Sequence, residues 1–177
     1  MASTPTVIET ERLVLRPHRL EDAENITRLW ADPEVVRYIG QPSTRQESWS
    51  RLLRYAGHWA LFGYGYFAVE ERATGRFIGD VGVAQFRREG VDEPENSAEA
   101  GWVLSSGCQG QGFGREAVTA LHRWIDTSLP VLRTHCIIDP RNEASVRLAR
   151  SVGYAEIGTV SYAGDTVLLL VRERGAC

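Results

Sequence analysis

The chain has 177 residues, 43% of them hydrophobic, and a formal net charge of −3. This size predicts a single domain, residues 1–177, with a core large enough to need no disulfides. The small negative charge and the absence of a basic run argue against nucleic acid as a partner.

Targeting and metal-binding patterns are also missing from the sequence. Residues 1–12 lack a basic segment followed by an apolar one, and no stretch approaches the roughly 18 uninterrupted apolar residues of a membrane span. We therefore expect a cytoplasmic protein with no membrane partner. The cysteines are odd in number without C-x-x-C spacing, and the histidines are scattered, so neither a disulfide framework nor a metal site is predicted. These residues are Cys108, Cys136, Cys177, His18, His58, His122 and His135.

The first third of the chain is predicted to contain one strand and two helices. Residues 12–16 alternate between polar and apolar side chains, as a strand does. A helix is expected from about residue 20 to the Asp-Pro pair that ends at Pro33. Thr44 and Glu47 have the spacing of a capping box, which predicts the start of a second helix. Its expected buried face consists of Trp49, Leu52, Leu53, Ala56 and either Trp59 or Ala60.

Strands dominate the rest of the chain. Three are expected at residues 66–71, 76–85 and 98–104, followed by an amphipathic helix after Gly114. A strand at 134–138, a helix at 142–152 and two strands around the turn pair Gly164-Asp165 complete the chain. The helix after Gly114 carries an apolar stripe of Ala117, Val118, Leu121, Trp124 and Ile125. The predicted order of elements is βααβββαβαββ.

A glycine-rich loop joins the strand at 98–104 to this helix. Gly110, Gly112 and Gly114 remove side chains where the backbone can approach a ligand, and the start of the helix offers unpaired N–H groups and a positive dipole end. A phosphate or pyrophosphate group is the ligand that such a site favours. A plain glycine-rich turn before a helix remains the alternative interpretation.

The glycine spacing shows which type of known phosphate-binding loop this segment resembles. A Walker loop would require G-x-x-x-x-G-K-[ST], but the frame that starts at Gly107 continues after Gly112 with Phe113 rather than lysine. A dinucleotide fingerprint would require G-x-G-x-x-G, whereas these glycines follow G-x-G-x-G. The spacing Gln109-x-x-Gly112-x-Gly114 instead resembles the pyrophosphate loop of the GNAT superfamily of acyl-CoA-dependent N-acyltransferases.

The resemblance extends over almost the whole chain. The order of elements is similar to that of the GNAT fold, and four segments resemble the RimJ/RimL-like branch: ETERLVLRP at 9–17, WADPEVVRYI at 30–39, GYGYFAV at 63–69 and NEASVRLARSVGY at 142–154. The resemblance implies an α+β domain with a mostly antiparallel, splayed central sheet flanked by helices. It implies acetyl-CoA as cosubstrate, a primary amine as acceptor and no metal.

The same resemblance implies which residues contact acetyl-CoA. A bulged strand at Val103 and Leu104 would supply backbone N–H groups, which can stabilise a developing oxyanion by a few kcal/mol. Asn142 would lie near the pantetheine arm. The remaining implied contacts come from the loop and the start of the helix: Gln109, Gly110, Gln111, Gly112, Phe113, Gly114 and Arg115.

Acyl transfer to an amine also needs a group that accepts a proton. An amine with a pKa of about 10 is almost fully protonated at pH 7, so a carboxylate or an ordered water has to remove a proton before the amine attacks the thioester. Glu99, on the strand that leads into the loop, resembles the glutamate that serves as base in some members of the superfamily. The alternative interpretation makes Glu99 a salt-bridge partner of an arginine.

The helix at 142–152 offers the second catalytic candidate. Ser145 shares a stripe with Asn142, and the resemblance places Ser145 near the sulfur of the leaving group. Alternatively, Asn142 is simply the N-cap of the helix and Ser145 bonds to backbone. Tyr154 follows Gly153 at the start of the next strand, where an aromatic core residue is expected, so we do not assign it a catalytic role.

The acceptor is the least determined part of the prediction. It is expected to be a small-molecule amine or a peptide N-terminus, and the chain could form a homodimer. Acidic residues between Glu89 and Glu95 could attract a cationic amine or form a solvated loop. A noncatalytic acyl-CoA sensor and a nucleotide-binding or structural domain remain alternatives. Aromatic residues that could line an acceptor pocket, or simply belong to the core, are Trp30, Tyr38, Trp59, Tyr64 and Tyr66.

Overall fold

The computed structural model describes residues 6–176. One eight-stranded sheet runs through it in the order β1-β2-β3-β4-β5-β6-β8-β7, and all neighbours are antiparallel except β5 and β6. This arrangement confirms the predicted α+β class and the mostly antiparallel sheet. The strands are β1 Ile8–Glu9, β2 Leu13–Pro17, β3 Tyr66–Glu71, β4 Phe77–Ala84, β5 Ser97–Leu104, β6 Arg133–Ile138, β7 Ala155–Tyr162 and β8 Asp165–Glu173.

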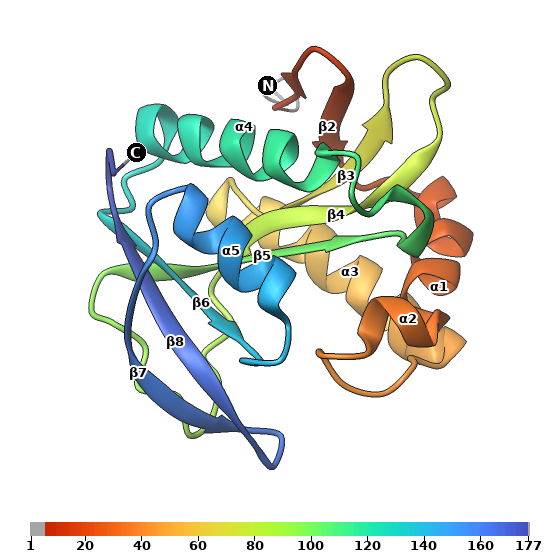
Figure 1. Ribbon diagram of the computed structural model, residues 1–177. Helices are drawn as coiled ribbons and strands as arrows, with labels where there is room; N and C mark the ends of the chain where they lie inside the picture. The colour runs from red at the N-terminus through yellow and green to blue at the C-terminus, as the bar shows by residue number, and fades with distance from the viewer. Residues whose placement is uncertain (1–5, 177) are drawn as a thin grey trace.

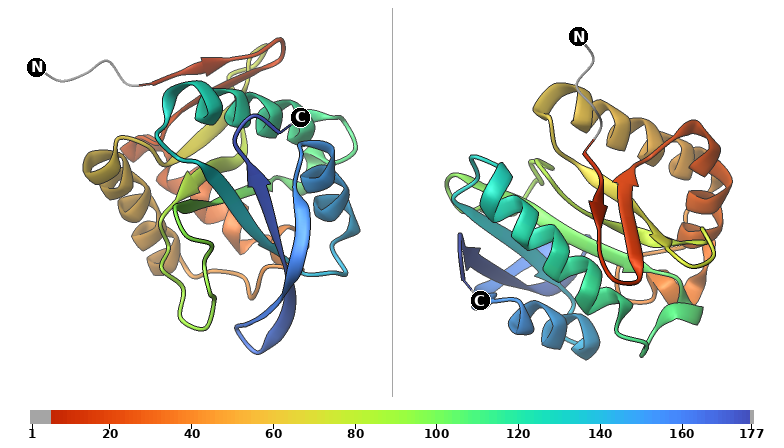
Figure 2. Two further views of the ribbon diagram at one scale, coloured as in Figure 1. Left: turned by 90° about the vertical axis from the view of Figure 1, so that its left-hand side faces the viewer. Right: turned by 90° about the horizontal axis from the view of Figure 1, so that it is seen from above.

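Helices cover both faces of the sheet (Figures 1 and 2). The first group, α1 to α3, packs on one face, and α4 and α5 pack on the other. The five helices are α1 Ala23–Ala31, α2 Pro33–Val36, α3 Arg45–Phe62, α4 Phe113–Ser128 and α5 Glu143–Ser151, with short 3-10 turns at Leu20–Asp22 and Ser106–Cys108.

Two elements were not in the predicted order. Strand β1 forms a short ladder with β2, in which Ile8 pairs with Leu15. Helix α2 begins directly after the expected break, because the Asp32 carboxylate accepts a hydrogen bond from the N–H of Glu34 at 2.9 Å and Pro33 occupies the first helical position. The Asp-Pro pair therefore ends one helix and starts another.

The predicted buried face of α3 is only partly right: Leu52 is buried and Trp59 packs against the larger core, but the helix is rotated from the predicted orientation. Trp49 and Leu53 are 43% and 54% exposed, and the side chains that face the protein interior are Ser48, Leu52, Tyr55 and His58. The reason is hydrogen bonding to the sheet, since His58 Nε2 accepts the backbone N–H of Gln85 at 2.9 Å. Polar and aromatic groups thus fix the rotation of α3. Its predicted capping box, Thr44 with Glu47, is confirmed.

Two hydrophobic cores hold the layers together. The larger core joins the sheet to α4 and α5, and it includes the predicted stripe of α4. The smaller core lies under α1 and α3 and contains Trp30, Tyr55 and Tyr66. Among residues 6–176, no helix is long and apolar enough to span a membrane.

The sheet opens between β5 and β6. These two strands pair only at Ser97 with Arg133, Ala98 with Thr134 and Glu99 with His135. Beyond this point β5 continues to Leu104 beside β4 alone. A wedge-shaped opening therefore starts at Glu99 and widens toward the loop that leads into α4 (Figure 1).

Candidate active site

The far half of β5 presents backbone groups to this opening. The N–H of Ser105 donates to the carbonyl of Ile78, and hydrogen-bonded pairs alternate along an antiparallel ladder. This alternation directs the N–H and C=O groups of Val103 toward β4, and those of Trp102 and Leu104 toward the opening. The β4–β5 register is continuous, so the bulge expected near Val103 is absent from this ladder.

The loop after β5 has the backbone conformation of a ligand-binding turn. Gly110 and Gly112 have φ of +73° and +80°, in the left-handed region that favours glycine. Gly112 is the N-cap of α4, and no side chain caps this helix. The first intrahelical hydrogen bond is donated by the N–H of Glu116 to the Gly112 carbonyl at 3.1 Å. The three preceding N–H groups at the start of α4 are therefore available to an anion.

Not every side chain of the predicted cofactor set is accessible. Phe113 is buried in the larger core, so only its backbone is available to a ligand. The Gln111 side chain turns back and donates to the Gly107 carbonyl at 2.9 Å. Gln109 and Arg115 are exposed beside the free helix end.

Arg12, which the sequence interpretation did not assign to the site, braces this loop. Its guanidinium donates to the Glu116 carboxylate at 2.7 Å and to the Gln111 carbonyl at 3.0 Å, and it lies 4.5 Å from the centre of the Phe113 ring. Burial opposes ionisation of Glu116, but hydrogen bonds from Thr10 and Arg12 hold the pKa of this carboxyl below its usual value. The start of β2 is thereby fixed to the first turn of α4.

Helix α5 borders the opening from the other side. The Asn142 side chain caps it by accepting the N–H of Ser145 at 3.2 Å, as the simpler interpretation predicted. Ser145 is half-buried, and its hydroxyl has no hydrogen-bond partner among residues 6–176 in the structure. A Cβ at Gly114 would lie 3.2 Å from Leu104 and 3.5 Å from Leu148. The end of β5, the start of α4 and the face of α5 therefore converge.

Glu99 lies at the narrow end of the opening and faces the α3 side of the sheet. It is almost fully buried, and both carboxylate oxygens accept hydrogen bonds from the Arg88 guanidinium, at 2.7 and 2.8 Å. Arg88 belongs to the segment between β4 and β5. The structure thus shows the ion pair of the alternative interpretation.

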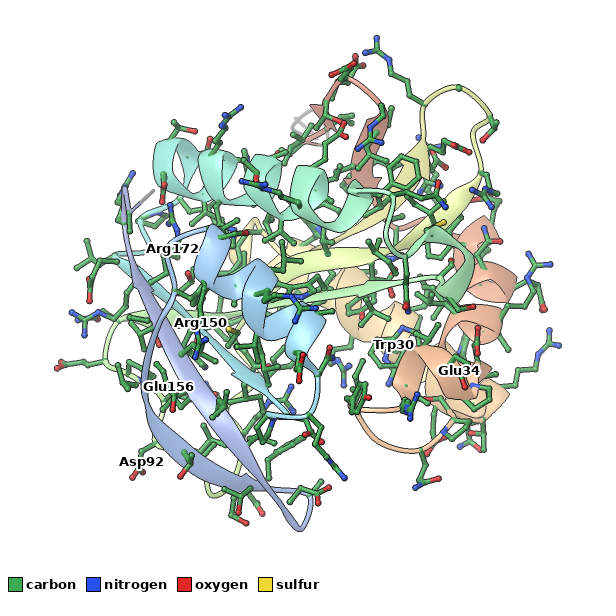
Figure 3. The ribbon with its side chains drawn as sticks, viewed as in Figure 1. Trp30, Glu34, Asp92, Arg150, Glu156 and Arg172 are labelled. Carbon is green, nitrogen blue, oxygen red and sulfur yellow. The ribbon has the colours of Figure 1, made fainter. Side chains whose placement is uncertain are left out.

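Asp80, a second buried carboxylate on the α3 side, is also paired. Asp80 binds His18 Nε2 at 2.7 Å and accepts the indole N–H of Trp30 at 3.0 Å. The second ring nitrogen of His18 lies 3.2 Å from the Tyr66 carbonyl. Trp30, labelled in Figure 3, therefore acts as a core residue tied to the sheet. Tyr64 and Tyr66 are also buried, whereas Tyr38 is half-buried outside both cores.

The core beneath α4 contains a complete chain of polar contacts. His122 lies 2.8 Å from the Val118 carbonyl and 2.8 Å from the Tyr154 hydroxyl, which is hydrogen-bonded to Thr134 at 2.7 Å. Burial lowers the pKa of His122 to about 4. Tyr154 is a buried core residue, as its position at the start of the strand predicted.

Comparison with known proteins identifies the family. Residues 12–155 match the acetyltransferase (GNAT) domain model, and the chain belongs to this family. It is 31% identical over 151 residues to the N-acetyltransferase p20 of Bacillus licheniformis, covering 84% of this chain and 82% of the relative. Together with the fold, this identifies an acetyl-CoA-dependent acetyltransferase.

Solved structures share the architecture. A GNAT-family acetyltransferase of Bordetella pertussis superposes with a TM-score of 0.84 at 28% identity, covering 94% of this chain and 99% of that chain. Two more distant structures share the fold alone. They are a ribosomal-protein-S5-alanine acetyltransferase of Vibrio fischeri (TM-score 0.77, 22% identity, 96% and 97% coverage) and a spermidine N-acetyltransferase of Vibrio cholerae in complex with CoA and spermine (TM-score 0.76, 20% identity, 94% and 98% coverage).

Proposed function

We propose that this acetyltransferase transfers the acetyl group to a primary amine by direct attack of the amine on acetyl-CoA in a ternary complex. One observation carries the proposal: an uncapped helix end and two left-handed glycines lie beside a sheet opening that is lined by free backbone groups. The first element suits a pyrophosphate, and the second suits an amide-containing arm followed by a thioester.

The proposed path of acetyl-CoA follows these elements in order. The pyrophosphate binds the loop from Gln109 to Gly112 and the first N–H groups of α4. The pantetheine arm runs along the opening between Leu104 and Asn142. The thioester oxygen accepts a backbone N–H of β5, from Trp102 or Leu104 rather than from Val103, because the N–H of Val103 faces β4.

The reacting ends of the two substrates meet toward the narrow end of the opening. Glu99 belongs to the step that removes the amine proton, as a base or by orienting the group that accepts it. Ser145, with its unpartnered hydroxyl on α5, donates a hydrogen bond to the departing thiolate. No step is assigned to a metal.

We assign the chain to the RimJ/RimL-like branch of the family on the four segments given above. The acceptor is then a protein or peptide N-terminus or a small-molecule amine. Among the structures that share this fold, one is named for the alanine of a ribosomal protein and another for spermidine, so both acceptor types are compatible with the scaffold.

The test is a thiol-release assay with acetyl-CoA against polyamines, aminoglycosides, amino acids and peptides with free N-termini. We expect release of CoA thiol in equal amount to an acetylated amine, identified by mass spectrometry. A noncatalytic acyl-CoA sensor would bind CoA and release no thiol with any acceptor. Acetylation through an acyl-enzyme adduct, formed without the amine, would also contradict direct attack.

A further inference from the structure

The narrow end of the opening holds a buried histidine nitrogen that has no hydrogen-bond partner among residues 6–176. His135, the β6 residue paired with Glu99, is almost completely buried, and its Nε2 makes no hydrogen bond to any of residues 6–176. It lies 3.9 Å from Glu99 Oε2. A buried ring nitrogen without a partner is costly, so its retention in a folded protein points to a function.

Hydrogen bonding at the other ring nitrogen fixes which form His135 takes. Ser97 Oγ donates its only hydrogen to the Pro94 carbonyl at 2.5 Å, so it can only accept from His135 Nδ1, 2.8 Å away. Nδ1 therefore carries the ring proton, and Nε2 keeps a free lone pair. Burial lowers the pKa of His135, although the Glu99 charge opposes this, and the ring is neutral at pH 7.

Two acceptors thus face the same point. A nitrogen about 2.8 Å from both His135 Nε2 and Glu99 Oε2 would satisfy each of them with one N–H bond, because 3.9 Å is less than the sum of two hydrogen bonds. The Glu93 carboxylate adds negative charge, since its ligand atom lies within 4.8 Å of the other two. The position suits a group that donates hydrogens and carries positive charge.

Arg88 already places a cation next to this position, on the Glu99 side. Its guanidinium carbon lies 4.6 Å from the ring centres of both Phe86 and Tyr162, and its Nη1 donates to the Tyr162 hydroxyl at 2.6 Å. With the two bonds to Glu99, these contacts form a cation seat made of two aromatic rings and one carboxylate. The segment that carries Arg88 runs beside the β7–β8 hairpin (Figure 2, left).

We propose that this seat receives the ammonium group of the acceptor, which replaces the Arg88 guanidinium, and that His135 Nε2 accepts its proton. The inference rests on the proposed transfer to an amine. The N–H bond of the ammonium breaks, and its proton moves to Nε2. The neutral amine forms a bond to the thioester carbon, the C–S bond breaks, and the nitrogen gives up its second proton, which the CoA thiolate takes up. Glu99 stabilises the imidazolium.

A metal ion is the weaker occupant. The carboxylates and His135 could supply ligand atoms, but a divalent cation would be placed beside the Arg88 charge and would have to compete for Glu99 oxygens that are already bound. Activity that is unchanged by EDTA supports an ammonium seat, and activity that is lost with EDTA and restored by zinc overturns it.

The decisive variant is His135→Asn, whose amide can keep the hydrogen bond to Ser97 while removing Nε2. We expect kcat to fall about 100-fold or more, the loss typical of a removed general base. The parent's kcat/KM should decline below pH 6.5 as Nε2 becomes protonated, and this acid limb should disappear in His135→Asn. A near-parent rate with an unchanged acid limb would remove His135 from the mechanism.

Arg88 provides a second measurement that a structural role would not produce. Arg88→Met vacates the seat while keeping an extended apolar side chain, so KM for the amine should fall. Arg88→Lys, the matched control, keeps a cation in the seat, and KM should stay near the parent value. If Arg88→Met raises KM, the Arg88 contacts build the site rather than occupy it, and the inference is wrong.

A spectroscopic measurement separates this inference from the proposed function. The ¹⁵N spectrum of His135 should show an unprotonated Nε2 in the free protein at pH 7. Adding the amine in the presence of CoA, which cannot react, should convert the Nε2 signal to that of a donor. Thiol release by the parent with an unchanged His135 spectrum would refute the seat and leave acetyl transfer intact. No thiol release by the parent would refute the proposed function instead.

Discussion

Two buried histidines on opposite faces of the sheet, His122 and His135, differ in their hydrogen bonding. Beneath α4, both ring nitrogens of His122 have partners. On the α3 side, His135 has one partner and one free lone pair beside a carboxylate. The core beneath α4 ends at the start of this helix, here called the rim, which offers backbone N–H groups. The α3 side holds an unpaired acceptor, His135 Nε2, beside a carboxylate. Strand β5 thus separates the rim, which we propose binds acetyl-CoA, from the face that carries Glu99 and His135, called the reactive face below.

The largest expected effect is the loss of stabilisation by acetyl-CoA when Gly112, at the rim, is replaced. Gly112→Val places a β-branched residue at a φ of +80°, which costs about 1–2 kcal/mol, and its side chain blocks the approach to the helix end. Acetyl-CoA at a hundred times its dissociation constant should stabilise the parent by roughly 2.7 kcal/mol, and we expect Gly112→Val to lose this stabilisation entirely. Thermal melting with and without acetyl-CoA measures it.

Gly107 provides the matched control for this experiment. It lies in the same loop with an ordinary φ, and a Cβ there would meet no atom within 4 Å. Gly107→Ala should keep the thermal shift. A parent that is stabilised by NAD but not by acetyl-CoA would contradict the assignment of the rim.

The second effect is the pH dependence of stability that follows from keeping His122 buried and uncharged. Its pKa is lowered from 6.5 to about 4, so between these pH values the unfolded chain binds a proton that the folded chain does not. The free energy of unfolding therefore falls as pH decreases from 6.5 to 4, by about 3 kcal/mol at about 1.4 kcal/mol per pKa unit.

Denaturant unfolding at pH 7 and pH 4.5 checks this prediction. His122→Gln removes the titrating group, so its stability should depend less on pH across the same window, whatever its stability at pH 7. Parallel pH dependences in the parent and in His122→Gln would show that His122 is protonated equally in the folded and unfolded chains.

A smaller effect is expected at the cap of α5. Asn142→Ala removes the acceptor for the Ser145 N–H and should cost about 0.5–2 kcal/mol of stability. If the same amide orients the pantetheine arm, affinity for acetyl-CoA should weaken as well. Titration calorimetry and chemical unfolding of the variant measure the two losses. Loss of stability with parent affinity would limit Asn142 to capping.

The smallest effect is expected at Ser145. Its hydroxyl is free within the described chain, and its proposed partner is a thiolate whose acid has a pKa near 8.5, for which water can substitute. Ser145→Ala should therefore slow single-turnover acetyl transfer several-fold and leave acetyl-CoA affinity intact. An identical single-turnover rate would reduce Ser145 to a packing residue.

The sequence predicted the rim better than the reactive face, for a physical reason. Left-handed glycines, an N-terminal helix end and a capping box are local features, so spacing alone revealed Gly110, Gly112 and Thr44. The reactive face joins residues that only the fold brings together. Arg88 meets Tyr162 across 74 positions of sequence, and His135 meets Ser97 across 38.

Helix α3 shows a different limit of sequence patterns. It carries two neighbouring apolar stripes, and the one that contains Trp49 and Leu53 is the more hydrophobic, so periodicity selected it. The structure buries Tyr55 and His58 instead, and His58 is hydrogen-bonded to the backbone of Tyr64, just before β3, and of Gln85, just after β4. Hydrophobicity counts cannot weigh a hydrogen bond to a strand that lies elsewhere in the sequence.

The short pairing of β5 with β6 has a mechanical consequence. Within the sheet formed by residues 6–176, three residue pairs are the only ladder between the five strands that begin with β1 and the three that end with β7. They lie at one end of the opening, so they form a pivot, and a small rotation there becomes a larger displacement at the wide end. Contacts at the pivot, such as the hydrogen bond between Ser97 and His135, therefore act on the width of the far end of the opening.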